Sequence, residues 1–253
     1  MKYNLKLIQQ RGFSLTELIV SLAILTLVSG AIFSQLDTAQ QRENTEQVKV
    51  DDFQEARDFV DQFFRDINQI GYPNSRMMDT TSVLWVPPLA APLYNDSRLA
   101  MGLVRIDVNE LRFEADTNGD GTVQSIVYMI NGSGTCALCL QRSQVPKVTN
   151  DPLLGQTQNW GTEVNDAVLT NPIFSYYDRN GTLIAVASLP ADTSTAAGRL
   201  ILASIKTVKL SLTIQNPAVV DLRTNQPIQT NFEGEVSINN CSMAATGQSM
   251  SCN

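Results

Sequence analysis

The chain has 253 residues, of which 43% are hydrophobic and 17% charged, a composition that excludes wholesale disorder and suffices for a hydrophobic core. Its formal net charge is −7, and an acidic surface repels phosphate backbones, so no nucleic-acid partner is expected. The sequence contains no histidine, which removes the commonest general base, the commonest zinc ligand and every Ser-His or Cys-His nucleophile. We therefore do not expect an enzyme.

The N-terminus combines a short basic segment with a long apolar run. The first twelve residues carry three cations and no anion, whereas residues 13–33 carry a single charge, Glu17. A helix of 21 residues is about 31 Å long at 1.5 Å per residue, and the hydrocarbon core of a bilayer is about 30 Å thick. Because basic flanks stay cytoplasmic, the pattern predicts one membrane span, with the rest of the chain outside the cytoplasm.

A secretory signal peptide and a plain signal anchor also begin with a basic segment and an apolar run. A signal peptide needs small residues at a cleavage site after the run, and the sequence around Ala31 meets this need poorly. Neither alternative explains Glu17, because an ionisable side chain within a span costs roughly 3 kcal/mol or more without a partner. Glu17 is therefore a candidate functional residue.

The octapeptide RGFSLTEL at residues 11–18 resembles the prepilin processing motif of type IV pilins and type II secretion pseudopilins. The resemblance implies that a prepilin peptidase cuts between Gly12 and Phe13 and that the new N-terminal Phe13 is N-methylated. Cleavage would leave a cationic amine on Phe13 at the membrane boundary. Glu17 of the same or a neighbouring subunit would neutralise this amine, and we expect that attraction to favour assembly.

A second helical pattern follows the apolar run. An apolar stripe with spacings of 3, 4, 3, 4 and 3 residues indicates one helix face, which we expect to pack on a globular domain; its members are Phe53, Ala56, Val60, Phe63, Ile67 and Ile70. The acidic residues, expected mostly on the opposite, solvated face, are Asp51, Asp52, Glu55, Asp58, Asp61 and Asp66. Gly71 and Pro73 end the pattern. No proline precedes them within this segment, so the sequence predicts one helix, interrupted or continuous, from Phe13 to about Ile70.

Short apolar segments separated by Gly, Asn, Asp and Pro follow, which is typical of strands and turns. A helix followed by strands predicts an α+β fold, with an antiparallel sheet packed on the helix. The expected strands are 83–86, 102–108, 110–115, 122–130, 173–177, 182–187, 206–215 and 232–238, with long loops at 80–95 and 141–171. The chain then divides into a leader (1–12), a transmembrane half-helix (13–33), an amphipathic half-helix (34–71) and a β-rich globular domain (72–253).

The loop that begins at Asp116 resembles the first half of an EF-hand calcium loop. Its oxygen-bearing residues alternate, and a glycine occupies the sixth position; they are Asp116, Asn118, Asp120 and Thr122. The twelfth position is Val127 rather than glutamate, and Asn-Gly and Asp-Gly also form hairpin turns. We expect a plain turn, with a weak calcium site as the alternative, and no other cofactor.

The four cysteines are Cys136, Cys139, Cys241 and Cys252. Four thiols could bind zinc, but the pairs are unequally spaced and the domain is expected outside the cytoplasm, which favours disulfides. Of the three connectivities we prefer Cys136–Cys139 with Cys241–Cys252. A Cys-x-x-Cys pair can also be redox-active. No cation surrounds this one in the sequence, so a structural role is the preferred interpretation.

Several sequence segments resemble those of the PilW family of minor pilins and of its relative, the GspJ pseudopilins. The segments are residues 64–67 with 71–72, 111–116, 174–178 with Gly181, and 205–212. The resemblance implies a minor pilin that helps to initiate or cap a type IV pilus. The implied partners are other pilins or pseudopilins, the prepilin peptidase and an inner-membrane assembly platform. The implied location is the inner membrane, with the domain in the periplasm, and the pilus after assembly.

Two alternative functions remain open. One is a minor pseudopilin of a type II secretion system. The other belongs to a different class, a filament-tip adhesin or ligand-binding module, for which Trp85, Trp160, Tyr176 and Tyr177 are the candidate aromatic residues. Isolated aromatic side chains usually belong to a core, so the structural subunit is the preferred interpretation.

Overall fold

The computed structural model of the chain describes residues 14–74, 98–131, 138–148, 152–154, 156–168, 172–220 and 226–240. The chain forms two compact units, Met1–Val48 and Lys49–Asn253. Gly12, Phe13, the expected strand at 83–86 and the expected loop at 80–95 lie outside the described residues.

Helix α1 runs without a break from Leu15 to Gln69, which confirms the single long helix expected from the sequence. Its first part, up to Val48, belongs to the first unit and its remainder to the second. Gly71 has a φ of 76°, a left-handed conformation that glycine adopts without strain. The Tyr72 N–H then donates to the Gln69 carbonyl at 2.9 Å. The helix therefore ends where the Gly71 signal predicted.

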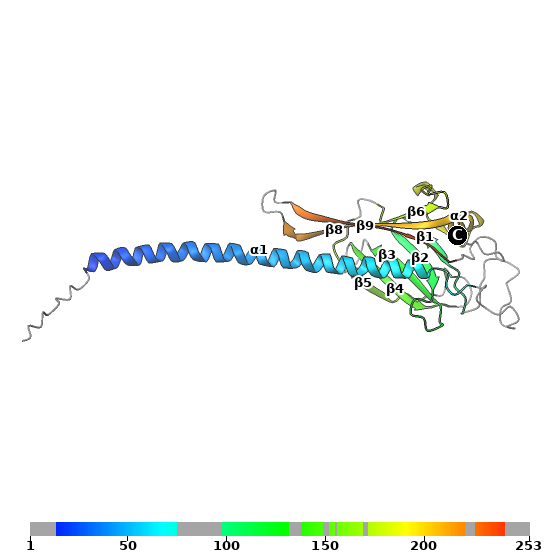
Figure 1. The fold of residues 1–253 in the computed structure, drawn as a ribbon, viewed down its shortest axis with the longest axis horizontal. Helices are drawn as coiled ribbons and strands as arrows, with labels where there is room; N and C mark the ends of the chain where they lie inside the picture. Colours follow the sequence, from blue (N-terminus) through cyan, green and yellow to red (C-terminus); the bar gives the residue numbers. More distant parts are fainter. Residues whose placement is uncertain are drawn as a thin grey trace, which may run out of the picture. The chain divides into compact units, whose positions relative to one another are not determined.

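Two antiparallel sheets build the second unit (Figure 1). The larger sheet has the strand order β5-β4-β3-β2-β1-β7 and the smaller one β6-β8-β9. The strands are β1 (Leu103–Ile106), β2 (Glu110–Ala115), β3 (Gln124–Asn131), β4 (Cys139–Pro146), β5 (Trp160–Val164), β6 (Phe174–Asp178), β7 (Ala191–Asp192), β8 (Ile205–Val220) and β9 (Pro227–Ser237). A short helix, α2 (Ala196–Ser204), precedes β8. The α+β fold with antiparallel pairing is confirmed, although the sequence predicted one sheet rather than two.

Two expectations about strands were wrong. The segment 182–187 forms only an isolated bridge between Leu183 and Tyr177, and the 3-10 turn Val186–Ser188 follows. Its apolar side chains Leu183 and Val186 are more than half exposed, so their alternation does not mark a buried strand. The expected loop at 141–171 contains most of β4 and all of β5. These strands lack an apolar pattern because β4 turns polar side chains toward polar partners, as described below.

The second half of α1 packs against both sheets. Four of its apolar side chains, and Ile70 in the turn that follows, are at most 1% exposed; the four are Ala56, Phe59, Phe63 and Ile67. Phe63 stacks on Phe174 of β6, with ring centroids 5.8 Å apart, and meets Tyr128 of β3 edge-on at 5.4 Å. The predicted stripe is therefore the packing face, with two corrections: Phe59 belongs to it, and Phe53 is 50% exposed.

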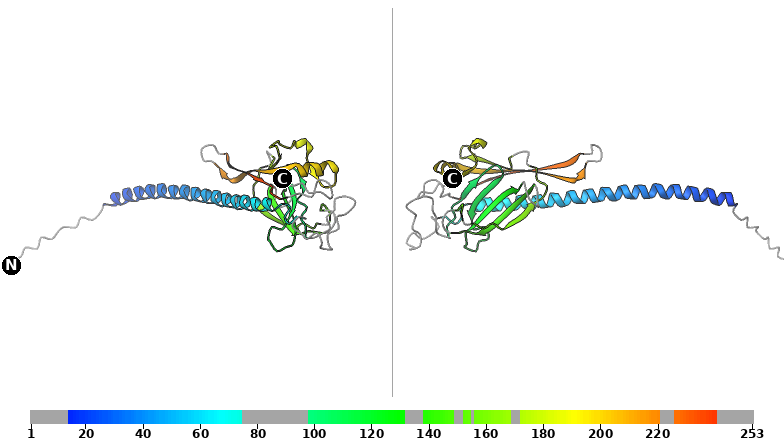
Figure 2. Two further views of the ribbon diagram at one scale, coloured as in Figure 1. Left: turned by 45° about the vertical axis from the view of Figure 1, so that its right-hand side comes forward. Right: turned by 180° about the vertical axis from the view of Figure 1, so that it is seen from behind.

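Further contacts hold the sheets and helix together. Tyr176 of β6 is 1% exposed, and its hydroxyl donates to the carbonyls of Asp107 and Glu110 at 2.8 and 3.2 Å, in the turn between β1 and β2. Burial raises the pKa of this hydroxyl well above its ordinary value. In the smaller sheet, β8 and β9 form a long ribbon that extends beyond the larger sheet in both views of Figure 2. Gly234 of this ribbon lies against the Phe64 ring of α1.

Candidate functional site: the exposed N-terminal helix and the anchor of its second half

The N-terminal part of α1 exposes an apolar surface that no other described residue of the first unit covers. Its large apolar side chains are 50–76% exposed; they are Leu15, Leu18, Ile19, Val20, Leu22, Ile24, Leu25, Leu27, Val28, Ile32, Phe33 and Leu36. An 18-residue window of the helix has a mean hydropathy of 2.1, and none of it is buried within the protein. By length and composition, α1 can cross a membrane.

Glu17 is the only charged residue between Ser14 and Leu36, and it lies in the first turn of the helix. The Ser14 N–H donates to Glu17 Oε2 at 3.0 Å. This bond is one half of a capping box, and the negative charge also complements the helix dipole; the Ser14 hydroxyl is paired with the Thr16 hydroxyl at 2.8 Å. The carboxylate is thus held at the N-terminal end of α1, beside the residue that follows Phe13 in the chain.

Residues 8–33 match the family model described as the prokaryotic N-terminal methylation motif. This motif is of the kind found at the N-terminus of type IV pilins and pseudopilins, and the match covers that segment of the chain alone. The exposed apolar helix is consistent with a membrane-anchored prepilin. No curated protein and no solved structure has significant similarity to the chain.

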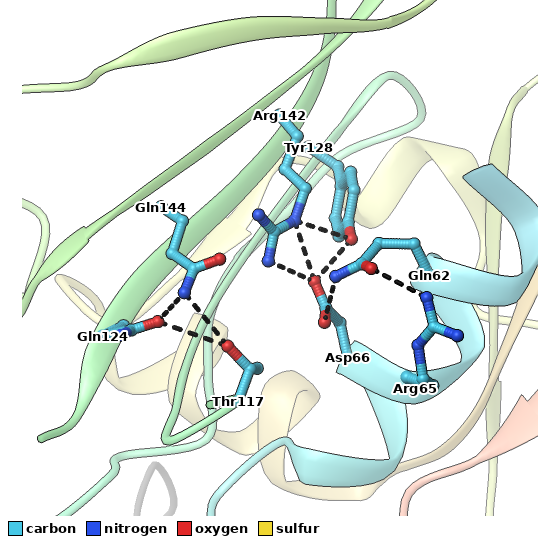
Figure 3. Close-up of polar contacts among 8 residues, drawn as sticks. All are labelled: Gln62, Arg65, Asp66, Thr117, Gln124, Tyr128, Arg142 and Gln144. Atoms are coloured by element: carbon cyan, nitrogen blue, oxygen red, sulfur yellow. Dashed lines mark hydrogen bonds and ion pairs between the residues drawn. The ribbon is translucent and has the colours of Figure 1, made fainter. Parts of the chain in front are cut away.

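A buried ion pair joins the second half of α1 to the larger sheet (Figure 3). Asp66 Oδ2 accepts hydrogen bonds from Arg142 Nη2 at 2.7 Å, from Arg142 Nε at 2.9 Å and from the Tyr128 hydroxyl at 2.6 Å. Oδ1 accepts from Gln62 Nε2 at 3.0 Å. The side chain of Asp66 is 2% exposed and that of Arg142 is 12% exposed.

The prediction that placed Asp66 among the solvated acidic residues was wrong. Asp66 follows Phe59 by seven residues and Phe63 by three, and these spacings return a side chain to the same face of a helix. The spacing was therefore a signal that could have placed Asp66 on the packing face. Its partner Arg142 could not be found in the same way, because it lies 76 residues away in the chain.

Tyr128 and Arg142 are directly opposite each other on β3 and β4. The guanidinium carbon lies 5.7 Å from the centroid of the Tyr128 ring, within the range of a cation–π contact. Burial, followed by the negative charge of Asp66, raises the pKa of the Tyr128 hydroxyl well above its ordinary value. The hydroxyl therefore stays protonated and donates to the carboxylate.

A neutral polar cluster continues from the ion pair along β3 and β4 (Figure 3). Gln144 Nε2 donates to Gln124 Oε1 and, at 3.3 Å, to Thr117 Oγ1. The Thr117 hydroxyl donates to Gln124 Oε1 at 3.2 Å. Gln144 follows Arg142 by two residues and so shares its face of the strand. These polar partners explain why β4 has no apolar alternation.

A second buried ion pair lies between the end of β2 and the residue after β4. Lys147 Nζ is 2.8 Å from Glu114 Oε2, and the two side chains are 1% and 0% exposed. Lys147 also donates to the Leu99 carbonyl at 2.8 Å, and the Met101 N–H donates to Glu114 at 2.9 Å. This pair holds residues 99–101 on the sheet, and sequence patterns did not indicate it.

The loop at 116–122 joins β2 to β3 as a hairpin turn. Asp116 accepts from the N–H groups of Gly119 and Gly121 at 2.8 and 2.9 Å, and Asp120 accepts from the Thr122 N–H at 2.7 Å. The bond from Thr122 lowers the pKa of the Asp120 carboxyl. In the described part of the chain, no three His, Cys, Asp or Glu side chains are grouped to hold a metal. The calcium site at Asp116, Asn118, Asp120 and Thr122 stays a prediction.

Of the four cysteines, Cys139 alone lies among the described residues, at the start of β4. It is disulfide-bonded, but no disulfide joins two cysteines within the described part of the chain. Cys136, Cys241 and Cys252 lie outside that part, so both preferred pairings stay predictions.

The aromatic residues considered for a ligand groove belong to different sheets. Trp160 is 38% exposed on β5, Tyr176 is buried in the core, and Tyr177 is half-buried on β6. Trp85 lies outside the described residues. A cavity of about 30 Å³ lies between Phe53, Phe232 and neighbouring residues of α1, β8 and β9, which is room for about two water molecules.

Proposed function

We propose that this protein is a minor pilin that helps to initiate or cap a type IV pilus. The observation that carries the proposal is the coincidence of the N-terminal methylation motif over residues 8–33 with an exposed apolar helical segment, residues 15–36, whose only charge is Glu17. An exposed apolar surface of this size needs a membrane or other subunits to cover it. The resemblance of the domain to PilW-type sequences supports the minor role.

Glu17 is proposed to neutralise the amine that cleavage leaves on Phe13. Among the described residues, its carboxylate accepts a bond from the N–H of Ser14, just before α1, and a carboxylate has about four acceptor positions. The capping bond therefore leaves room for an ammonium group of the same or a neighbouring subunit. Because the surroundings would be apolar, an unpaired charge at either position would be costly.

Mass spectrometry of the N-terminus of the protein extracted from its native membrane tests the proposal. The expected result is a chain that begins at an N-methylated Phe13. A chain that begins near Ala31, or that still begins at Met1, would overturn the proposal. A Gly12 substitution is a matched control, because it changes the residue before the cut and should leave the unprocessed chain in the membrane.

A minor pseudopilin of a type II secretion system is the second candidate, because the same motif occurs in both classes. Both would lie in the inner membrane as precursors, with the domain in the periplasm, and both would bind a prepilin peptidase, other pilin-like subunits and an assembly platform. Affinity purification of the full chain from cross-linked cells separates them. Recovery of pilus subunits supports the minor pilin, and recovery of secretion-system subunits supports the pseudopilin.

A further inference from the structure

The apolar residues of α1 determine which face packs on the sheets, but those between Ala56 and Phe63 would also fit one alternative position along the sheet. A slide of the helix by four residues is a shift of about 6 Å. It would replace Ala56 by Val60, Phe59 by Phe63, and Phe63 by Ile67. These three replacements are apolar, so this part of the core would be filled in either position, whereas Gly71 would take the place of Ile67, which is 0% exposed. At the next place along the face, Ile70 would replace Asp66.

The ion pair distinguishes the two positions. In the observed position, Arg142 donates two hydrogen bonds to Asp66 at 2.7 and 2.9 Å, and its side chain is 12% exposed. In the shifted position, Arg142 would face the aliphatic side chain of Ile70 and keep a buried, unpaired charge. Breaking a buried pair by removal of one partner is strongly destabilising.

A slide in the opposite direction is prevented by the apolar pattern itself. It would bring Glu55 into the place of Phe59, which is 1% exposed and lies 5.7 Å from the Tyr128 ring. A carboxylate placed between aromatic rings would lack a partner. The apolar pattern thus opposes this direction at Phe59; in the other direction it opposes the slide only beyond Phe63, at Ile67, and the ion pair opposes it at Asp66.

We propose that Asp66, with its partners Arg142 and Tyr128, sets the register of α1 on the larger sheet. The three are positioning residues. Tyr128 contributes the 2.6 Å bond from its hydroxyl and a ring that lies against both Arg142 and Phe63. Gln62, one turn before Asp66, binds the remaining carboxylate oxygen, so a single position satisfies the whole group.

The register has a consequence for assembly, and this consequence rests on the function proposed above. Because α1 is continuous from Leu15 to Gln69, the register on the sheet determines how many helical residues separate the sheet from the apolar segment at 15–36. A filament built by parallel packing of such helices needs the same number in every subunit. A subunit in the shifted register would differ from its neighbours by about one helical turn.

The test measures the register directly in the full-length chain in detergent. Nitroxide labels are attached to unnatural amino acids at Asp58 on α1 and Glu235 on β9, both exposed, and the distance is measured by double electron–electron resonance. The unmutated protein should give one distance. Asp66→Leu/Arg142→Met should give a second population displaced by up to about 6 Å. This variant should fold, because apolar replacement of a buried ion pair is often neutral or stabilising.

The competing explanation is that backbone contacts beyond the helix fix the register, since the Gly71 N–H donates to the Glu114 carbonyl at 3.1 Å. If they hold the register, the double variant keeps only the original distance, and the proposal is overturned. A second variant, Asp66→Leu/Ile70→Asp, moves the carboxylate by one turn. The shifted distance should then predominate, and predominance of the original distance would also overturn the proposal.

The matched control is Glu114→Gln/Lys147→Met, which removes the other buried ion pair without touching a side chain of α1. It should keep one distance even if stability falls. A second distance in this control would show that loss of any buried pair loosens the helix, contrary to the proposal. The distance measurement uses monomers and does not depend on assembly. Its outcome is therefore independent of the proposed function, which mass spectrometry of the N-terminus tests.

Discussion

Replacement of Asp66 by asparagine should destabilise the globular unit severely. The substitution keeps the size of the side chain but removes the charge that Arg142 needs. In the structure, three hydrogen bonds of 2.6 to 2.9 Å converge on one carboxylate oxygen, and the side chain is 2% exposed. Water therefore cannot replace the lost partner, and the buried Arg142 loses the carboxylate to which it donates, although the negative charge of Glu163 on β5 still acts on it.

The expected loss is about 3–5 kcal/mol in the free energy of unfolding, the range for a buried ion pair broken on one side. Folded domains are stable by about 5–15 kcal/mol, so Asp66→Asn should lower the denaturation midpoint greatly. Urea denaturation of the full-length protein in mild detergent, followed by circular dichroism, measures the change.

Glu233→Gln is the matched control, because it makes the same carboxylate-to-amide change in an exposed pair. Glu233 lies 2.9 Å from Lys209, and the two side chains are 60% and 32% exposed. An exposed pair contributes about 0–1 kcal/mol, so the control should be nearly neutral. If Asp66→Asn also costs less than about 1 kcal/mol, the pair is effectively solvated and the reasoning is refuted.

Four further predictions concern other parts of the chain. Glu17→Gln should leave cleavage after Gly12 intact and impair incorporation into filaments, measured by immunoblot of sheared filaments; normal incorporation would exclude the proposed pairing. Gly234→Ala should cost about 1–3 kcal/mol, because the added methyl group would overlap the Phe64 ring, and Phe64→Leu in the same chain should restore part of the loss. Burial is the first cause that raises the pKa of the Tyr128 hydroxyl in the folded protein, so the unfolded chain loses this proton at a lower pH than the folded one. The contribution of Tyr128 to the free energy of unfolding is therefore fully present below about pH 10 and falls as the pH rises further. Tyr128→Phe should show a smaller fall, measured by denaturation between about pH 9 and 11. Calorimetry with millimolar calcium should give no heat if the loop at Asp116 is a plain turn, and a saturable signal that Asp116→Asn removes would establish the calcium site.

The sequence was most informative where the signal lies in neighbouring residues. The length of α1 follows from apolar spacing between Leu15 and Ile70, and its end from Gly71, because helix periodicity and left-handed glycine are properties of a few consecutive residues. The same holds for the hairpin after β2, where a glycine follows each of Asn118 and Asp120. Both side chains accept hydrogen bonds from backbone N–H groups of the same loop. The processing motif is also contiguous, and residues 8–33 match it.

The sequence failed where a strand depends on distant partners. β4 and β5 were expected to be loops because Gln141, Arg142 and Gln144 show no apolar alternation. Their polar side chains are nevertheless accommodated inside the unit, since Arg142 meets Asp66 on the helix and Gln144 meets Gln124 on the next strand. Such pairs replace hydrophobic burial with hydrogen bonds, and no pattern within one strand reveals them.

The sequence by itself thus determined the membrane-type helix, the single carboxylate within its apolar run, the processing motif and the α+β class. The tertiary structure alone decided that there are two sheets, that β4 and β5 are strands, and that Asp66 is buried rather than solvated. The physical reason is the range of the interactions. Periodicity and turns depend on residues one to four positions apart. Arg142, which neutralises the buried Asp66, lies 76 residues away on another element.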